Sequence, residues 1–196
     1  MARPDHRTNL TTAAIMLFRA QGFAATGLNQ IVADSGAPKG SLYHYFPGGK
    51  EELGATAVEV AGVAVADALR SIAAESVSFA DFLSRYLYMV AGWLEESDFS
   101  AGCPIATVLL ENAPGSESIT AAGQAALDDW TDIIADVLRR DGVEDAARQA
   151  RGVLAAVEGG MLMARVQRST AVLLGLQSVL RRSILDTDFP TQKETT

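Results

Sequence analysis

Apolar residues recur along most of this chain at the three- and four-residue spacing of amphipathic helices. In the stretch from Asn9 to Gln21 they fall on one stripe: Leu10, Ala13, Ala14, Leu17 and Phe18. Comparable spacing predicts further helices over 50–75, 79–96, 105–111, 116–140, 144–168 and 171–185. No segment alternates apolar and polar residues as a half-buried strand does. The pattern therefore predicts an all-α fold of about nine helices.

The stretch from Thr26 to Leu53 differs, because it holds two short helices around a tight turn. Leu28, Ile31 and Val32 place apolar groups on one face of the first short helix. The Thr26 hydroxyl is expected to cap the start of that helix.

Gly36 is expected to end the first short helix in the left-handed conformation, and Pro38 to begin the second, which runs to about Tyr45. Two helices joined by such a turn form a helix-turn-helix unit. Leu42 is the expected buried anchor of the second helix, and Gly40 lets its backbone approach a groove closely. The remaining side chains suit phosphates and base edges: Lys39, Ser41, Tyr43, His44 and Tyr45.

The chain reads I-V-A-x-S-G-A-P-K-G-S-L-Y-H-Y-F from Ile31 to Phe46, after G-F-x-x-T at Gly22 to Thr26 and AAIMLF at Ala13 to Phe18. This stretch resembles the DNA-binding domain of the tetracycline-repressor (TetR) family of bacterial regulators. Pro38 stands where that family usually has Ser or Thr, and His44 followed by Tyr45 replaces the usual aromatic-then-His pair, so either of the two is the DNA contact. The resemblance implies DNA contacts from Thr26, Lys39, Gly40, Ser41, Tyr43, His44, Tyr45 and Lys50.

Lys50 opens the first long helix, where backbone N–H groups would help it to hold a phosphate; the alternative is a solvated lysine. That helix continues without a flexible linker into the rest of the chain. We therefore expect a DNA-binding domain over 1–50 and a ligand-binding and dimerisation domain over 51–196.

The charge of the chain is divided between these two parts. The chain carries −8 overall, but residues 1–50 hold five basic residues against two acidic ones. Residues 51–196 hold 11 basic and 22 acidic residues. The charges therefore indicate a basic DNA-binding part, residues 1–50 (the reader), on an acidic remainder, residues 51–196 (the body). The net charge of the reader is modest, which favours binding of DNA by two chains together.

Composition places the protein in the cytoplasm. Apolar residues make up 48% of the chain, but charged residues such as Glu59 and Glu158 interrupt every apolar run, so no membrane helix is expected. The N-terminus has no apolar core of a secretory signal. The single cysteine, Cys103, fits a reducing compartment.

Aromatic and methionine side chains on three of the expected helices have two interpretations, an ordinary core or the lining of a ligand cavity. Members of the resembled family bind an inducing small molecule in the C-terminal body. The resemblance therefore marks the following residues for ligand contact: Phe82, Tyr86, Met89, Trp93, Leu109, Trp130, Glu158, Met161 and Arg165.

The segment from Gly102 to Thr107, with Glu158 to Gly160 later in the chain, resembles the subgroup of lincomycin-resistance regulators. Cys103 could be a sensor only with a lowered thiol pKa, and no basic neighbour in the sequence provides one. A buried loop residue is the favoured interpretation of Cys103.

Small residues beside leucines on the last two expected helices permit close packing of a second copy, and the family pairs its chains there as a four-helix interface. The expected dimer residues are Gly152, Ala156, Gly159, Leu173, Leu176 and Leu180.

Candidate chemistry of other kinds is weak. Asp128, Asp129, Asp132 and Asp136 share one helix, but only two histidines exist to complete a transition-metal site, and surface carboxylates are usually solvated. Gly48-Gly49-Lys50 lacks the spacing of a phosphate-binding loop. We expect no catalytic residues, metal or cofactor, and hence no enzyme.

The sequence predicts a DNA-binding repressor released from a palindromic operator by an apolar or aromatic ligand, and the alternative is a helical small-molecule-binding protein that never touches DNA.

Overall fold

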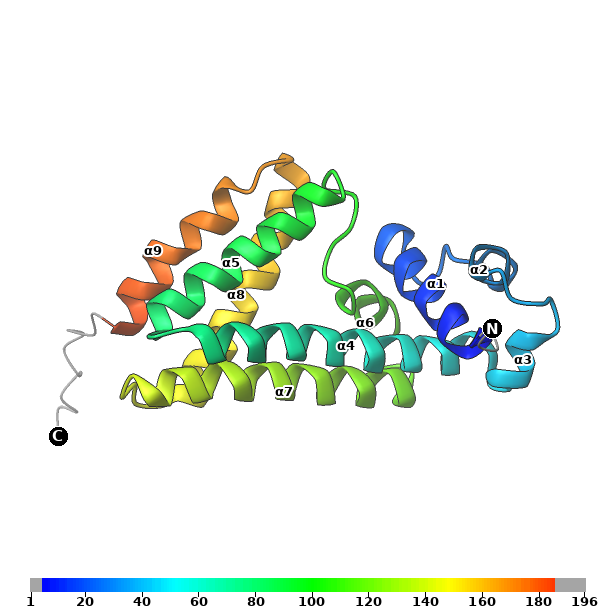
Figure 1. Cartoon of the computed structure of the whole chain (residues 1–196), viewed down its shortest axis with the longest axis horizontal. Helices are drawn as coiled ribbons and strands as arrows, with labels where there is room; N and C mark the ends of the chain where they lie inside the picture. Colours follow the sequence, from blue (N-terminus) through cyan, green and yellow to red (C-terminus); the bar gives the residue numbers. More distant parts are fainter. Residues whose placement is uncertain (1–4, 186–196) are drawn as a thin grey trace, which may run out of the picture.

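The computed structural model describes residues 5–185 and confirms the all-α prediction (Figure 1). Within those residues the helices are α1 His6–Gln21, α2 Leu28–Ser35, α3 Ser41–Tyr45, α4 Gly49–Glu75, α5 Phe79–Glu96, α6 Ala106–Asn112, α7 Glu117–Arg140, α8 Ala146–Gln167 and α9 Ala171–Leu185. No helix of the described part is long and apolar enough to cross a membrane. Arg3, counted above in the basic charge of 1–50, lies outside the described residues.

The first helix starts earlier than its apolar stripe predicts. α1 begins at His6 because the Asp5 carboxylate accepts the backbone N–H of Thr8 at 3.2 Å. The Thr8 hydroxyl also donates to the Asp5 carboxylate, at 2.6 Å, and this bond is the main cause that holds the pKa of Asp5 below its usual value, with the backbone bond as the second. The polar residues His6 to Thr8 thus form the first turn of the helix.

The helix-turn-helix is present, with two corrections to the predicted details. Gly36 ends α2 at φ +65°, as predicted. The second helix starts at Ser41 instead of Pro38, because residues 38–40 form a turn in which the Ser41 N–H donates to the Pro38 carbonyl at 2.9 Å. Thr26 does not cap α2: Gly27 is the N-cap, and the buried Thr26 hydroxyl donates to the Gly22 carbonyl at 2.6 Å.

α4 and α7 lie side by side as the long axis of the molecule (Figure 1). Their approach is close because Gly62 of α4 has no side chain; a Cβ there would lie 2.7 Å from the Cβ of Ala126 on α7. The Trp130 indole of α7 donates to the Gly62 carbonyl at 2.9 Å. These contacts make the two helices a rigid support for both ends of the molecule.

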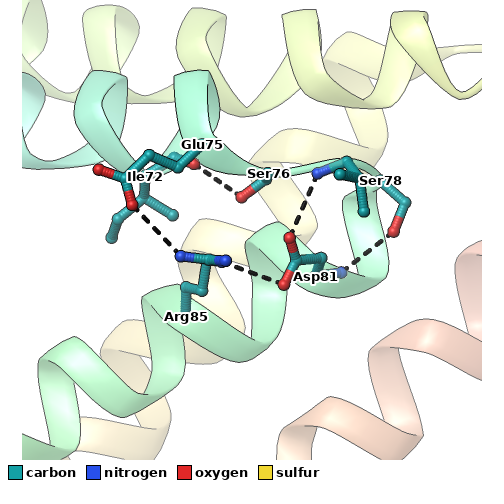
Figure 2. A network of polar contacts seen from close by, with 7 residues as sticks. Ile72, Glu75, Ser76, Ser78, Asp81 and Arg85 are labelled. Carbon is teal, nitrogen blue, oxygen red and sulfur yellow. Dashed lines mark hydrogen bonds and ion pairs between the residues drawn. The ribbon is translucent and has the colours of Figure 1, made fainter.

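A polar network fixes the corner at which the chain leaves α4 for α5 (Figure 2). Ser78 caps α5 by accepting the Asp81 N–H at 3.2 Å, and the Asp81 carboxylate accepts the Val77 N–H at 3.2 Å. Arg85 joins Glu75 of α4 to Asp81 of α5, with distances of 3.3 and 3.0 Å. Its hydrogen bond is the main cause of the lowered pKa of Asp81.

α8 and α9 pack closely within one chain. A Cβ on Gly160 of α8 would lie 2.8 Å from Leu176 and 3.0 Å from Leu173 of α9. Leu173 is fully buried in this contact.

Candidate DNA-reading surface and ligand cavity

The second helix of the helix-turn-helix presents an exposed polar surface. Lys39, Gly40 and His44 are exposed, and Tyr43 is 64% exposed. Leu42 faces the opposite way and is buried with Phe46, so one short helix carries both an anchor and a free face.

His44 and Tyr45, the two alternatives at one family position, are placed differently. The rings meet edge to face with centroids 4.9 Å apart. His44 is exposed, whereas Tyr45 is half-buried and packs against the core. Ser41 is half-buried, and its hydroxyl donates to the Pro38 carbonyl at 2.6 Å. Side-chain exposure therefore favours His44 over Tyr45 for contact with DNA.

Lys50 lies at the joint between the reader and the body. Its ammonium donates to the Ala24 carbonyl at 3.3 Å and lies 4.5 Å from the centroid of the Phe23 ring. Burial lowers the pKa of Lys50, partly offset by the nearby Glu111 carboxylate. Thr26 is buried at the same joint, with 1% of its surface exposed.

A cavity of about 640 Å³ lies between α6, α8 and the loop that connects α5 to α6. This volume suits a drug-sized molecule. Of the residues predicted to contact a ligand, the cavity brings together Leu109, Glu158, Met161 and Arg165. Sequence reasoning missed other apolar lining residues: Ile105, Ala106, Leu110, Leu127 and Leu162. For Ile105, Ala106 and Leu110 the only signal was the short apolar helix between two loops, and Leu127 and Leu162 lie on the long helices α7 and α8.

The aromatic side chains predicted to contact a ligand, and Met89, do not line this cavity. They belong to the core or pack against it: Phe82, Tyr86, Met89, Trp93 and Trp130. Trp130 is 1% exposed, and its indole N–H donates to the Gly62 carbonyl of α4. Trp130 therefore serves the α4–α7 packing.

Three groups that can release a proton lie close together: Cys103 and Glu158 line the cavity, and Tyr86 lies in the core near them. Burial raises the pKa of the Glu158 carboxyl, and the adjacent Cys103 thiol opposes this in part. Burial, reinforced by Glu158, raises the pKa of Cys103. Burial also raises the pKa of Tyr86, with Glu158 as a further cause. Cys103 is thus a buried, unreactive thiol.

Two arginines hold the loop that forms the rim of the cavity. Arg165 of α8 donates to the carbonyls of Ser100 at 2.9 Å and Phe99 at 3.4 Å. Arg19 of α1 donates to the Gly102 carbonyl at 2.6 Å. Burial lowers the pKa of Arg19, and Arg165 adds to this as a nearby positive charge. The loop between α5 and α6 therefore lines the cavity and also contacts α1 of the reader through Arg19.

Helix α6 joins the cavity to the reader more directly. Ala106, Leu109 and Leu110 of α6 line the cavity. At the end of the same helix the Glu111 carboxylate accepts the backbone N–H of Phe23 at 3.0 Å and that of Ala24 at 2.5 Å. Both donors belong to the loop between α1 and α2.

Phe23 itself is packed between the two parts. Its ring lies against Phe18 of α1, with centroids 5.0 Å apart, and against Gly54 of α4, where a Cβ would meet it at 2.7 Å. The Phe23 ring is thus packed against α1 and α4, while its backbone N–H is bonded to Glu111 of α6.

The predicted dimer residues fall into two groups. Gly152 and Gly159 are exposed, and Ala156, Leu176 and Leu180 are half-buried. The prediction for Leu173 is corrected. This side chain is fully buried between α8 and α9 of its own chain, so it has no exposed surface that a partner could contact. The exposed apolar residues of these helices, which the sequence reasoning did not select, are Leu162, Met163, Val166 and Val179.

No cluster of His, Cys, Asp and Glu that could hold a metal ion exists within residues 5–185. The aspartates of α7 differ from one another: Asp129 pairs with Arg70 at 2.7 Å and Asp136 with Arg139, while Asp128 and Asp132 are exposed.

Two family models match the chain. Residues 10–56 match bacterial regulatory proteins of the tetR family, and residues 80–178 match the C-terminal domain of LmrA/YxaF-like transcriptional regulators. The first contains the helix-turn-helix, and the second contains the cavity and most of α9.

Known regulators are similar over most of their length. The HTH-type transcriptional regulator LmrA of Bacillus subtilis is 32% identical over 182 residues, covering 92% of this chain and 97% of LmrA. The uncharacterized HTH-type transcriptional regulator YxaF of the same organism is 33% identical over 175 residues, covering 88% of this chain and 92% of YxaF. A TetR regulatory protein from Rhodobacter sphaeroides shares the fold, with a TM-score of 0.83 at 21% identity over 91% of this chain and 98% of its own.

Proposed function

Because the chain belongs to the TetR family of DNA-binding transcriptional regulators, we propose that it is a repressor whose hold on a palindromic operator is released by a small apolar molecule. The molecule occupies the cavity between α6 and α8, and the protein acts in the cytoplasm as a homodimer. Membership of this family argues against the alternative of a small-molecule carrier that never touches DNA.

The DNA reader in this proposal is the exposed face around α3. Lys39 provides a charge for phosphate or a guanine edge, and Tyr43 and His44 provide donors beside it. Gly40 gives the backbone room to approach the groove. Thr26 is omitted from the reader because it is buried, and Lys50 supports the α1–α2 loop.

The dimer interface in this proposal uses the outer faces of α8 and α9. Gly152, Gly159, Leu162 and Val166 lie on one stripe of α8, and all four are exposed. Val179 adds an exposed apolar group on α9. Covering this stripe with its own two-fold copy would remove it from water and would set two readers on successive major grooves.

One observation carries the regulatory part: α6 lines the cavity and also holds the reader through Glu111. A ligand that binds best when α6 is displaced would pull Glu111 away from the α1–α2 loop. The two readers would then lose their fixed spacing, and coupling of about 1 to 3 kcal/mol is typical of such switches.

The experiment starts from operator DNA selected from a random pool. Compounds that raise the melting temperature of the protein are then tested for release of this DNA by the wild type and by Glu111→Ala. The proposal expects Glu111→Ala to bind the compound but to show little or no compound-dependent change in DNA affinity. Glu59→Ala, an exposed acidic position on α4, should respond like the wild type. Equal release from wild type and Glu111→Ala would contradict the proposed route.

A further inference from the structure

Glu158 is the acidic residue among those that line the cavity, and its surroundings are mostly apolar. Its neighbours along the lining include Met161, Leu109 and Leu127. A carboxylate in such a place has lost most of its hydration, which is costly unless a partner compensates its charge.

The part of the chain that the structure describes places no cation against Glu158. Within residues 5–185, no Lys, Arg or His nitrogen lies within 4 Å of this carboxylate. Arg165 lines the same cavity, but its guanidinium is bonded to the Ser100 and Phe99 carbonyls. The side chain that lies next to the Glu158 carboxyl is the Cys103 thiol, a weak neutral donor.

We propose that the ligand of this cavity is an apolar molecule that carries a protonated amine, and that the Glu158 carboxylate is its counter-ion. This inference rests on the proposed function, since it names the chemical class of the molecule that occupies the cavity. The amine brings the missing positive charge, and its N–H groups donate to carboxylate oxygens that have no cationic partner among residues 5–185.

Other ligand charges fit the cavity less well. An anion would lie near Glu158, while the Arg165 guanidinium on the same lining is bonded to backbone carbonyls. A neutral ligand would bring no positive charge to Glu158 and would gain one ordinary hydrogen bond at most. The body that surrounds the cavity is also strongly acidic, which draws cations toward it.

The other ionisable groups near Glu158 do not supply the positive charge that an amine would bring. Tyr86 approaches from α5 and Cys103 from the α5–α6 loop, and burial keeps both protonated. Thr107 of α6 and Leu127 of α7 line the cavity without ionising, and Arg165 stands on α8. Proton exchange on amine binding therefore centres on Glu158.

The test uses three fluorescent probes that share one ring system: 9-anthracenylmethylamine, 9-anthracenemethanol and 9-anthracenecarboxylate. Each is titrated into the full-length wild type, Glu158→Gln and the control Glu59→Gln. The amine should bind the wild type at least about tenfold more tightly than the alcohol, because its ammonium forms a buried charge-assisted hydrogen bond with the Glu158 carboxylate. This preference should vanish in Glu158→Gln with alcohol binding unchanged, and persist in Glu59→Gln.

A second measurement needs no variant at Glu158. In the wild type, amine affinity should rise as the pH increases above the ordinary range of a glutamate, because burial raises the pKa of Glu158 and the cation binds its ionised form, while alcohol affinity should stay flat.

Two results would overturn the inference and leave the proposed function intact: alcohol or carboxylate binding as tight as amine binding, or an amine preference that survives Glu158→Gln. Absence of binding by all three probes would instead contradict the ligand cavity itself, and with it the ligand-release part of the proposed function.

Discussion

The Glu111 carboxylate of α6 accepts the backbone N–H of Phe23 at 3.0 Å, across the boundary between the body and the DNA reader. Its second oxygen accepts the next N–H, that of Ala24, at 2.5 Å. Two backbone donors of the α1–α2 loop are thus satisfied by one side chain of the helix that lines the cavity. Helix α6 therefore lines the ligand cavity and also bonds to the α1–α2 loop of the DNA reader.

Arg19 makes a second link between the DNA reader and the body. Replacement of Arg19 by lysine should weaken this link. Lysine lacks the Nε–H that donates to the Gly102 carbonyl at 2.6 Å. Because this group is half-buried, we expect Arg19→Lys to lower the free energy of unfolding by about 1 to 2 kcal/mol in urea denaturation. Arg151→Lys, at an exposed position of α8, is the control and should change little. Equal stability of the two variants would show that the link contributes nothing.

The DNA reader can be tested at two positions of α3 and the turn before it. Tyr43→Ala should weaken operator binding by about tenfold, and Lys39→Ala should also reduce the slope of log affinity against log salt by about 1, because one phosphate contact is lost. Tyr88→Ala is a matched control, since Tyr88 on α5 is as exposed as Tyr43, at 64%. Operator affinity of both reader variants equal to that of Tyr88→Ala would refute the assigned surface.

The close approach of α4 and α7 predicts a rescue experiment. Gly62→Ala should destabilise the protein by about 1 to 3 kcal/mol, because its Cβ would lie 2.7 Å from the Cβ of Ala126. Ala126→Gly added to Gly62→Ala should recover part of that loss. Calorimetric melting of the two single variants and the double variant measures the coupling. Additive effects would mean that the two positions do not meet.

Cys103 should resist alkylation in the folded protein. Burial raises its pKa, so the reactive thiolate is scarce at neutral pH and forms only at a higher pH than in a free cysteine. Iodoacetamide at about pH 8 should therefore modify Cys103 only after unfolding in urea. Ala33→Cys adds an exposed thiol on α2 as the control, and mass spectrometry should find one modified site per folded chain. Rapid modification of both sites would contradict the burial of Cys103.

The helices were predictable from the sequence to the extent that local chemistry decides them. The ranges of α5 and α9 follow from apolar spacing, and Gly36 ends α2 in the predicted left-handed conformation. Pro38 misled the prediction, because a proline in a turn and a proline at the first position of a helix need the same φ. The start of α3 was decided by the hydrogen bond from Ser41 to Pro38.

The cavity was less predictable, because its walls come from distant segments. Trp130 has the size and apolar character of a ligand contact, yet it is buried against Gly62, which lies 68 positions earlier. Glu111 gave no sign of its role, since its partners are backbone groups 88 and 87 positions away. Such contacts depend on tertiary packing, which the spacing of residues along one helix does not encode.

The most direct test of the central claim is a distance measurement between the reader and the body. Spin labels at Ala33→Cys on α2 and Ala121→Cys on α7, both exposed positions, would be placed in a chain with Cys103→Ala and diluted with unlabelled protein so that only intrachain pairs are observed. Pulsed electron spin resonance then gives the distribution of distances with and without Glu111→Ala. If Glu111 fixes the reader on the body, the distribution is narrow with Glu111 and clearly broadened or shifted in Glu111→Ala. Identical distributions would contradict the claim that α6 controls the position of the DNA reader.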